Sequence, residues 1–187
     1  MVSTFFLADV TVAMITLVYM SSLQGQNARL MQLLFWVGYG FGLTWEVAFY
    51  LNGPLFSSKP AYRLLDDYPL PLLTLPFLHA AWDGLLLVTG RRLVQLLCPK
   101  PHFAKFNYFE LAVLVLWGNL QEITVELLAT SLGVWTFVPQ AWNPQMFGFC
   151  GGAITLMPQL IWTIAPVLFY FIALRLTVHH NRQSWHS

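Results

Sequence analysis

Residues 107–130 read NYFELAVLVLWGNLQEITVELLAT, and this segment sets the class of fold. It is apolar over most of its length, yet it carries Asn119, Glu122 and Glu126 at spacings of three and four residues. A helix needs about 20 mostly apolar residues to cross a hydrocarbon core of about 30 Å. Residues three or four apart share one helix face. The segment therefore predicts a membrane-spanning helix with one polar stripe.

Four further segments are long and apolar enough to cross a membrane: residues 3–22, 30–51, 69–89 and 146–176. The last of them contains Pro158 and Pro166, which predicts a kink or a tilt. The first has no basic residues before it and no clear small-residue cleavage site, so we expect it to remain as a helix. The sequence thus predicts a single transmembrane domain over residues 1–187, an all-α integral membrane bundle of five helices.

The composition agrees with a membrane location. Of 187 residues, 57% are hydrophobic and 9% are charged, whereas an average soluble domain has about 25% charged residues. The formal net charge is +1 and the basic residues do not cluster, which argues against a nucleic acid partner. Cys98 and Cys150 are predicted to lie at different depths, so we expect neither a disulfide nor a metal-binding cysteine pair.

The connecting segments predict the orientation, because the loops of a five-span chain alternate between the two sides. Seven basic residues fall on one side, namely Arg29, Arg91, Arg92, Lys100, Lys105, Arg175 and Arg182, and two on the other, Lys59 and Arg63. The positive-inside rule predicts a cytoplasmic C-terminus and an outer or luminal N-terminus. The membrane would be the endoplasmic reticulum in a eukaryote or the inner membrane in a bacterium. Residues 131–145, uncharged and with two Trp, are expected to cap the bundle at the interface.

Ionisable side chains within a membrane are costly unless they are paired or hydrated, so each marks a candidate site. His79 and Asp83 are four residues apart and share a face of the third segment, as Glu122 and Glu126 share a face of the fourth. Neither stripe can face lipid. We expect both to line one polar pocket inside the bundle, together with Glu46 of the second segment.

Asp9 and Glu110 lie near predicted helix ends. Their side chains are therefore expected to reach the headgroup region by snorkelling rather than to enter the pocket.

Two carboxyl groups held close in a low dielectric cannot both ionise cheaply, so one keeps its proton while a neighbour pairs with a histidine. This combination provides a proton donor and a proton acceptor, as general acid–base catalysis requires. The predicted catalytic residues are Glu46, His79, Asp83, Glu122 and Glu126. An interhelical hydrogen-bond network without chemistry is one alternative. A metal site is another, although helical bundles usually supply Glu-x-x-His motifs for it, which this chain lacks. No cofactor is expected.

Aromatic and amide side chains accompany these groups. Trp45 precedes Glu46, and Trp162 follows Gln159 by three residues. The face of a Trp ring stabilises a cation by about 0.5–2 kcal/mol, which would suit a carbocation, although packing is the ordinary role of any single Trp. The predicted substrate-binding residues are Trp45, Asn119, Gln159 and Trp162.

Residues 159–168, QLIWTIAPVL, resemble the last helix of the emopamil-binding-protein (EXPERA) family, where an amide, a Trp and a Pro occur at the same offsets. The predicted five spans, and Glu46 followed by Phe49 and Tyr50, also fit that family of sterol isomerases and sterol-binding proteins. The isomerases carry a His one turn before this Glu, where this chain has Gly42. More weakly, Trp45-Glu46 resembles the helix-two Trp-Glu of small membrane-bound meroterpenoid (terpene) cyclases.

Both resemblances imply that a buried carboxyl group protonates an apolar isoprenoid and that a second group removes a proton. The leading hypothesis is a membrane-embedded isomerase or cyclase acting on an isoprenoid or sterol-like substrate. Glu46 and either Glu122 or Glu126 would be donor and acceptor, with His79 and Asp83 as a relay. The alternatives are a non-catalytic lipid-binding or accessory subunit of a membrane complex and a proton-coupled carrier, the latter disfavoured because no internal repeat is visible. Expected partners are the hydrophobic substrate and membrane lipids, and oligomerisation stays open.

Overall fold

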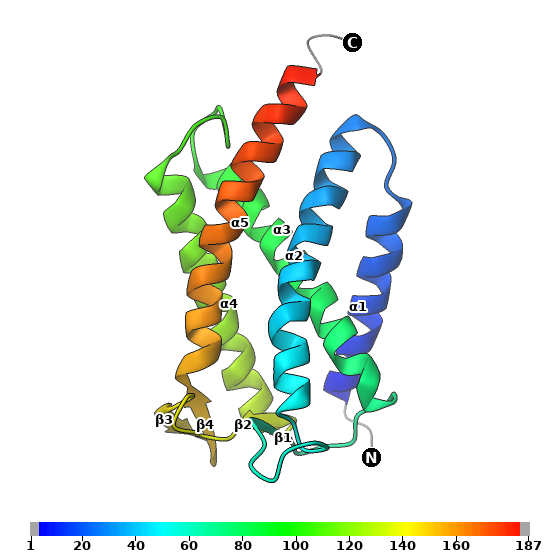
Figure 1. Ribbon diagram of the computed structural model, residues 1–187, viewed down its shortest axis with the longest axis vertical. Helices are drawn as coiled ribbons and strands as arrows, with labels where there is room; N and C mark the ends of the chain where they lie inside the picture. The colour runs from blue at the N-terminus through cyan, green and yellow to red at the C-terminus, as the bar shows by residue number, and fades with distance from the viewer. Residues whose placement is uncertain (1–3, 184–187) are drawn as a thin grey trace.

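The computed structural model describes residues 4–183 as helices that run alternately in opposite directions, with a small sheet at one end (Figure 1). The helices are α1 (Thr4–Ser22), α2 (Gln26–Leu51), α3 (Leu75–Leu97), α4 (Tyr108–Ser131) and α5 (Leu156–Gln183). The strands are β1 (Tyr62–Leu64), β2 (Trp135–Phe137), β3 (Gln145–Phe149) and β4 (Gly152–Thr155), and a 3₁₀ turn, η1 (Leu72–Thr74), precedes α3.

Four segments of the described chain are long and apolar enough to cross a membrane: Thr4–Ser22, Leu72–Leu97, Tyr108–Ser131 and Leu156–His180. The chain is therefore mostly helical and has the character of a membrane protein. Helix α2 is not among them, although it is 26 residues long, because its Gly, Trp, Tyr and Gln residues lower its mean hydropathy. The prediction of five spanning helices is thus confirmed only in part.

The prediction of an all-α fold is wrong for two connections between helices. The α2–α3 and α4–α5 connections form a four-stranded antiparallel sheet in the order β1-β2-β4-β3. Tyr62 pairs with Phe137, and Phe137 pairs with Ala153. Residues 146–155, expected to begin the fifth helix, form the β3–β4 hairpin instead. Gly151 at its turn has φ +81°, a conformation that a helix does not contain.

Two prolines displace the third helix from its expected range of residues 69–89. Neither Pro69 nor Pro71 has an N–H to donate, and Pro71 is extended (φ −54°, ψ 132°), so α3 begins only at Leu75, with Pro76 in the first turn where an N–H is not needed. The helix then continues to Leu97 and ends at Cys98. Cys98 is extended (φ −101°, ψ 151°) because it precedes Pro99.

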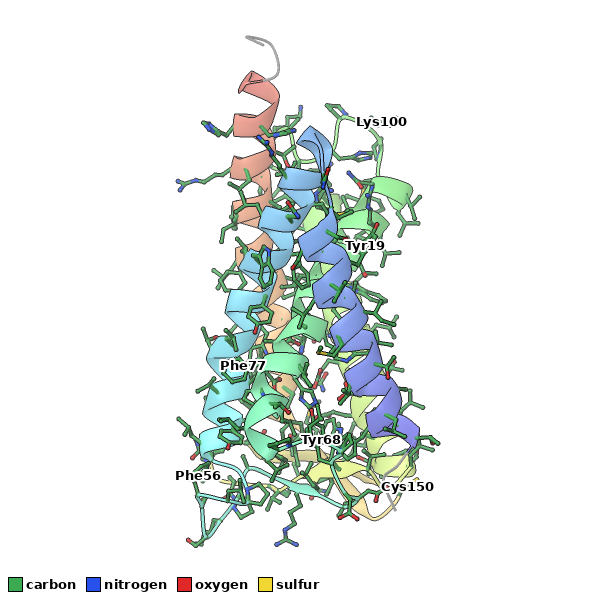
Figure 2. The ribbon with its side chains drawn as sticks, turned by 90° about the vertical axis from the view of Figure 1, so that its right-hand side faces the viewer. Tyr19, Phe56, Tyr68, Phe77, Lys100 and Cys150 are labelled. Atoms are coloured by element: carbon green, nitrogen blue, oxygen red, sulfur yellow. The ribbon has the colours of Figure 1, made fainter. Side chains whose placement is uncertain are left out.

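Helices α2 and α3 pack closely through glycines. A Cβ atom added to Gly38 would lie 3.0 Å from the Cα of Gly84. Helices α4 and α5 approach in the same way, since a Cβ on Gly118 would lie 2.6 Å from the carbonyl oxygen of Trp162. Small residues allow such backbone contact between membrane helices. Helix α1 packs beside this group, mainly against α3 (Figure 2).

The two ends of the bundle differ in charge. The α1–α2 loop, the α3–α4 loop and the end of α5 lie together, opposite the sheet and the start of α1 (Figure 1). Lys100 and Lys105 lie in the α3–α4 loop, and the other basic residues predicted to share this side lie in the helix turns next to these segments: Arg29 at the start of α2, Arg91 and Arg92 near the end of α3, and Arg175 and Arg182 toward the end of α5. We call this the basic end. Lys59 and Arg63 belong to the opposite, sheet end.

The two native cysteines provide a test of the orientation. Cys150 is exposed at the turn between β3 and β4, whereas Cys98 is buried near the basic end, and Figure 2 shows Cys150 and Lys100 at opposite ends. If the basic end is cytoplasmic, a membrane-impermeant maleimide applied to the cytoplasmic face will label Cys150 only after detergent is added. Ala104→Cys in a Cys150→Ser background is the control and should be labelled without detergent. Labelling of Cys150 from the cytoplasmic face would contradict the predicted orientation.

Candidate functional site

A cavity of about 380 Å³ lies at the sheet end of the bundle, with residues from all of the described helices in its walls. Its floor is made by the sheet, through Tyr62 and Leu64 of β1 and Trp135 and Phe137 of β2. Most of the remaining lining is apolar or aromatic. Small-molecule sites have volumes of about 300–1,000 Å³ and are mostly apolar with a few polar groups. The cavity therefore has the size and character of a site for an apolar small molecule.

His79 of α3 lies between two carboxyl groups on the cavity wall. Its Nε2 is 3.4 Å from Oδ2 of Asp9 on α1, and its Nδ1 is 3.4 Å from Oε2 of Glu46 on α2. A neutral imidazole carries one N–H, and an ionised carboxylate only accepts. Two such contacts therefore require either an imidazolium or a protonated carboxyl group. The Asp9–His79–Glu46 triad is thus a candidate site for proton exchange.

Asp9 is a site residue that the sequence analysis placed elsewhere. The expectation that it reaches the headgroups is wrong, because α1 packs against α3 and turns Asp9 toward His79. The indole Nε1 of Trp82 donates to the backbone oxygen of Asp9 at 3.2 Å and helps to hold α1 in place. One sequence signal was available: Asp9 is the only charged residue of α1.

Asp83 also lines the cavity, as expected from its spacing with His79. Its carboxyl group is buried and accepts a hydrogen bond from Nε1 of Trp45 at 3.0 Å. Gly42 provides the space, because a Cβ there would lie 2.5 Å from Oδ2 of Asp83 and 2.9 Å from the Cα of Ala80. Any side chain at position 42 would collide with this carboxyl group.

The two glutamates of α4 have different surroundings. Glu122 lines the cavity and makes no hydrogen bond or ion pair with the described residues. Glu126 is only 1% exposed and accepts a hydrogen bond from Nε2 of Gln159 at 3.2 Å. The prediction that both line one cavity is wrong for Glu126. A side chain four residues further along a helix is rotated by about 40° beyond one full turn. Glu126 therefore faces α5, whereas Glu122 faces the cavity.

Asn119 and Gln159, predicted to bind substrate, lie outside the cavity lining and connect α4 to α5 instead. The amide of Asn119 donates to the Val115 oxygen at 2.9 Å and accepts from Oγ1 of Thr163 at 3.0 Å. Trp45 and Trp162, the other two predicted binding residues, do line the cavity. Their ring centroids are 6.1 Å apart at an interplanar angle of 62°.

Glu110 lies far from this cavity, near the basic end. The expectation that it snorkels is wrong, because it is 1% exposed. Its carboxyl oxygens accept from the backbone N–H of Phe103 at 3.1 and 3.3 Å and from the hydroxyl of Tyr170 at 3.3 Å. These bonds tie the α3–α4 loop to α5.

Tyr62 is a further site residue that the sequence analysis did not identify. It is buried in the cavity floor, and desolvation raises its pKa to about 12, with a smaller contribution from the negative charge of Glu46. Its hydroxyl therefore keeps its proton at neutral pH and stays a hydrogen-bond donor. Nothing in the sequence pointed to it, because it lies in a loop that the hydropathy pattern places outside the bundle.

The charges around the cavity are unbalanced. Its described lining contains four carboxyl groups, those of Asp9, Glu46, Asp83 and Glu122, one imidazole, and neither Lys nor Arg. Burying several uncompensated negative charges is expensive. Electroneutrality therefore favours carboxyl groups that retain protons. Among residues 4–183, no three His, Cys, Asp or Glu side chains are placed to hold a metal ion.

No family model, curated protein or solved structure matches this chain. We therefore describe the class of this protein from its fold and its cavity. It is a helical protein with membrane-spanning character whose apolar, aromatic cavity carries a surplus of acid groups.

Proposed function

We propose that this protein is a membrane-embedded isomerase or cyclase that acts on an isoprenoid or sterol-like substrate by proton transfer. One observation carries the proposal: four carboxyl groups and one imidazole lie on the wall of an otherwise apolar cavity that has no Lys or Arg in its described lining. The apolar wall favours a hydrocarbon ligand. The surplus of acid groups supplies protons, the reagent that turns an alkene or epoxide into a carbocation.

The proposal includes a fifth membrane crossing by α2. The 26 residues of this helix extend about 39 Å, enough for a hydrocarbon core of about 30 Å. It packs against α3 along the bundle and connects the two ends, so its less apolar composition is accommodated by protein contacts. With five crossings, the basic end is cytoplasmic, and the cavity lies in the outer or luminal half of the membrane.

Glu46 is the proposed proton donor, and Glu122 on the opposite helix is the proposed acceptor. A proton from Glu46 forms a C–H bond with the π electrons of the substrate alkene and leaves a carbocation. Glu122 then takes a proton from a neighbouring carbon, and the electrons of that C–H bond form the new double bond. In a cyclisation, a second alkene attacks the cation before this proton is lost. Before the next turnover, Glu122 releases to water the proton that it took up, and a proton taken from water returns to Glu46 through Asp9 and His79.

Aromatic side chains complete the proposed site. Trp45 and Trp162 contribute to the wall, and the faces of Trp rings stabilise cations by about 0.5–2 kcal/mol. Trp45 also donates to Asp83, which makes Asp83 a positioning residue for the indole. Glu126, Asn119 and Gln159 act in this proposal only by holding α4 and α5 together.

The resemblance to the EXPERA family supports this assignment, although the histidine that accompanies the glutamate lies on a different helix in this chain. That family carries a His on helix two, where this chain has Gly42. The space beside Gly42 is filled by Asp83, and the imidazole next to Glu46 comes from His79 of α3 instead. A Glu–imidazole pair is thus present, with the imidazole supplied by a different helix.

Reaction in D₂O tests the proposal. The purified protein in nanodiscs is incubated with a panel of sterol alkenes, polyprenyl alkenes and polyprenyl epoxides, and the products are examined by mass spectrometry. A proton-transfer enzyme is expected to give an isomerised or cyclised product with one deuterium at the protonated carbon. The Glu46→Gln protein is the matched control and should give none. Tight binding of these compounds without any product or deuterium would instead favour a non-catalytic lipid-binding or accessory subunit.

A further inference from the structure

Arg91 is a buried cation toward the basic end, eight residues along α3 from Asp83 and outside the lining of the cavity. It lies on α3 and is only 9% exposed. Its Nε has no hydrogen-bond partner. No Asp or Glu among residues 4–183 comes within ion-pair distance of its guanidinium. A buried charge without a counter-ion or acceptor is strongly unfavourable, so the site calls for an anion.

The surroundings of Arg91 supply no such anion. Its Cζ lies 5.5 Å from the ring centroid of Phe103, a fully buried residue of the α3–α4 loop. A cation–π contact stabilises the charge but accepts no hydrogen bond along the plane of the guanidinium. Glu110 contacts the same Phe103, but its oxygens accept from the Phe103 N–H and the Tyr170 hydroxyl, and it forms no ion pair with Arg91. The planar donors of Arg91 are thus left without an acceptor among the residues that the structure describes.

The position of Arg91 indicates which anion fits. The contact with Phe103 places the guanidinium at the level of the α3–α4 loop, and Arg91 is six residues, about 9 Å, from the end of α3. If α3 spans the membrane, its end at Leu97 lies close to the phosphates of the membrane lipids. Further positive charge comes from Arg92, Lys100 and Lys105 at the same end. Arginine binds phosphate oxygens through its fork of N–H donors.

We infer that Arg91 is the centre of a phosphate-binding site at the basic end of the bundle, occupied by the headgroup of an anionic phospholipid. The adjacent Arg92 has a different role. It is solvent-exposed and already donates to Oε1 of Gln95 at 3.1 Å. This inference does not depend on the proposed catalytic activity.

Lipid titration of the full chain tests the site. Delipidated protein in detergent is titrated with phosphatidylglycerol, with phosphatidylcholine and with inorganic phosphate, and binding is followed by native mass spectrometry and by melting temperature. Phosphatidylglycerol is expected to bind and to raise the melting temperature. Arg91→Gln should weaken its binding by about 10–100-fold, the usual effect of losing a hydrogen bond to a charged group. Arg92→Gln, the matched control, should change binding by less than about threefold, as for an exposed charge.

Three results would overturn the inference. Equal weakening by Arg91→Gln and Arg92→Gln would show general charge attraction rather than a site. Equal affinity for phosphatidylcholine would remove the preference for an anionic lipid. Stabilisation by inorganic phosphate as large as that by phosphatidylglycerol would replace the lipid by free phosphate. If Arg91→Gln fails to fold, Arg91→Lys serves instead: it keeps the charge but loses the planar fork, and should bind more weakly than wild type.

Discussion

Glu122→Gln is expected to reduce turnover by about 10²–10⁴-fold, the usual contribution of general acid–base catalysis, while the bundle stays folded. Glutamine has nearly the shape of glutamate, but its amide cannot take up and release a proton as a carboxyl group does. The substitution breaks no hydrogen bond among the described residues, because Glu122 makes none there. Glu46→Gln should have the same effect on the opposite wall of the cavity. Turnover and melting temperature, measured on the same preparations, separate loss of chemistry from loss of structure.

Glu126→Gln is the matched control for Glu122→Gln. The two residues are one turn apart on α4, and both are buried, but only Glu122 lines the cavity. Glu126→Gln is therefore expected to retain turnover within about threefold, because its partner Gln159 can still form an amide hydrogen bond. Equal activity of the Glu46 and Glu122 variants and wild type would rule out the acid–base assignment. A loss as large in the Glu126 variant would show that the cavity wall is assigned incorrectly.

Gly42→Ala is expected to lower the free energy of unfolding by about 1–3 kcal/mol, the usual cost of overpacking. The new methyl group would lie 2.5 Å from Oδ2 of Asp83 and 2.9 Å from the backbone Cα of Ala80, so α2 and α3 would have to separate. Thermal unfolding in detergent measures the effect. The separation would also move Trp45 relative to Asp83, so activity should fall together with stability.

Gly40→Ala provides the comparison on the same helix. No atom lies within 4 Å of a Cβ at this position. Alanine is a better helix former than glycine by about 1 kcal/mol, so this variant should be as stable as wild type or more stable. A similar melting temperature for the two alanine variants would contradict the close contact between α2 and α3 at Gly42.

The sequence predicted the parts of the fold that depend on local pattern. Helices α1 and α4 lie within about two residues of their expected ranges, because hydrophobic length alone sets a membrane segment. The start of α5 was misplaced because residues 146–155 are apolar enough for a helix and yet pair as a hairpin around Gly151. Hydropathy does not distinguish a short apolar strand from the first turns of a membrane helix.

The sequence likewise predicted the parts of the candidate site that depend on local spacing and missed those that depend on contacts between helices. Spacing within one helix correctly placed His79, Asp83 and Glu122 on the cavity wall. Spacing failed for Glu126, and nearness to a helix end failed for Asp9, because the surroundings of both residues are set by the neighbouring helix rather than by their own. The carboxyl group of Asp9 meets a histidine more than 60 residues later in the chain, a contact that no local pattern encodes.

The pairing of β1 with β2 also determines when the floor of the cavity can form during synthesis. These strands come from the α2–α3 and α4–α5 connections, and Tyr62 and Phe137, which pair across them, are separated by 74 residues. When Asp9, Glu46 and His79 have left the ribosome, β1 has no neighbour and the cavity has no complete floor. Helix α4 must be inserted before β2 arrives to close it. A nascent chain that stops after α4 would carry most of the ionisable groups of the site in a chamber still open to water.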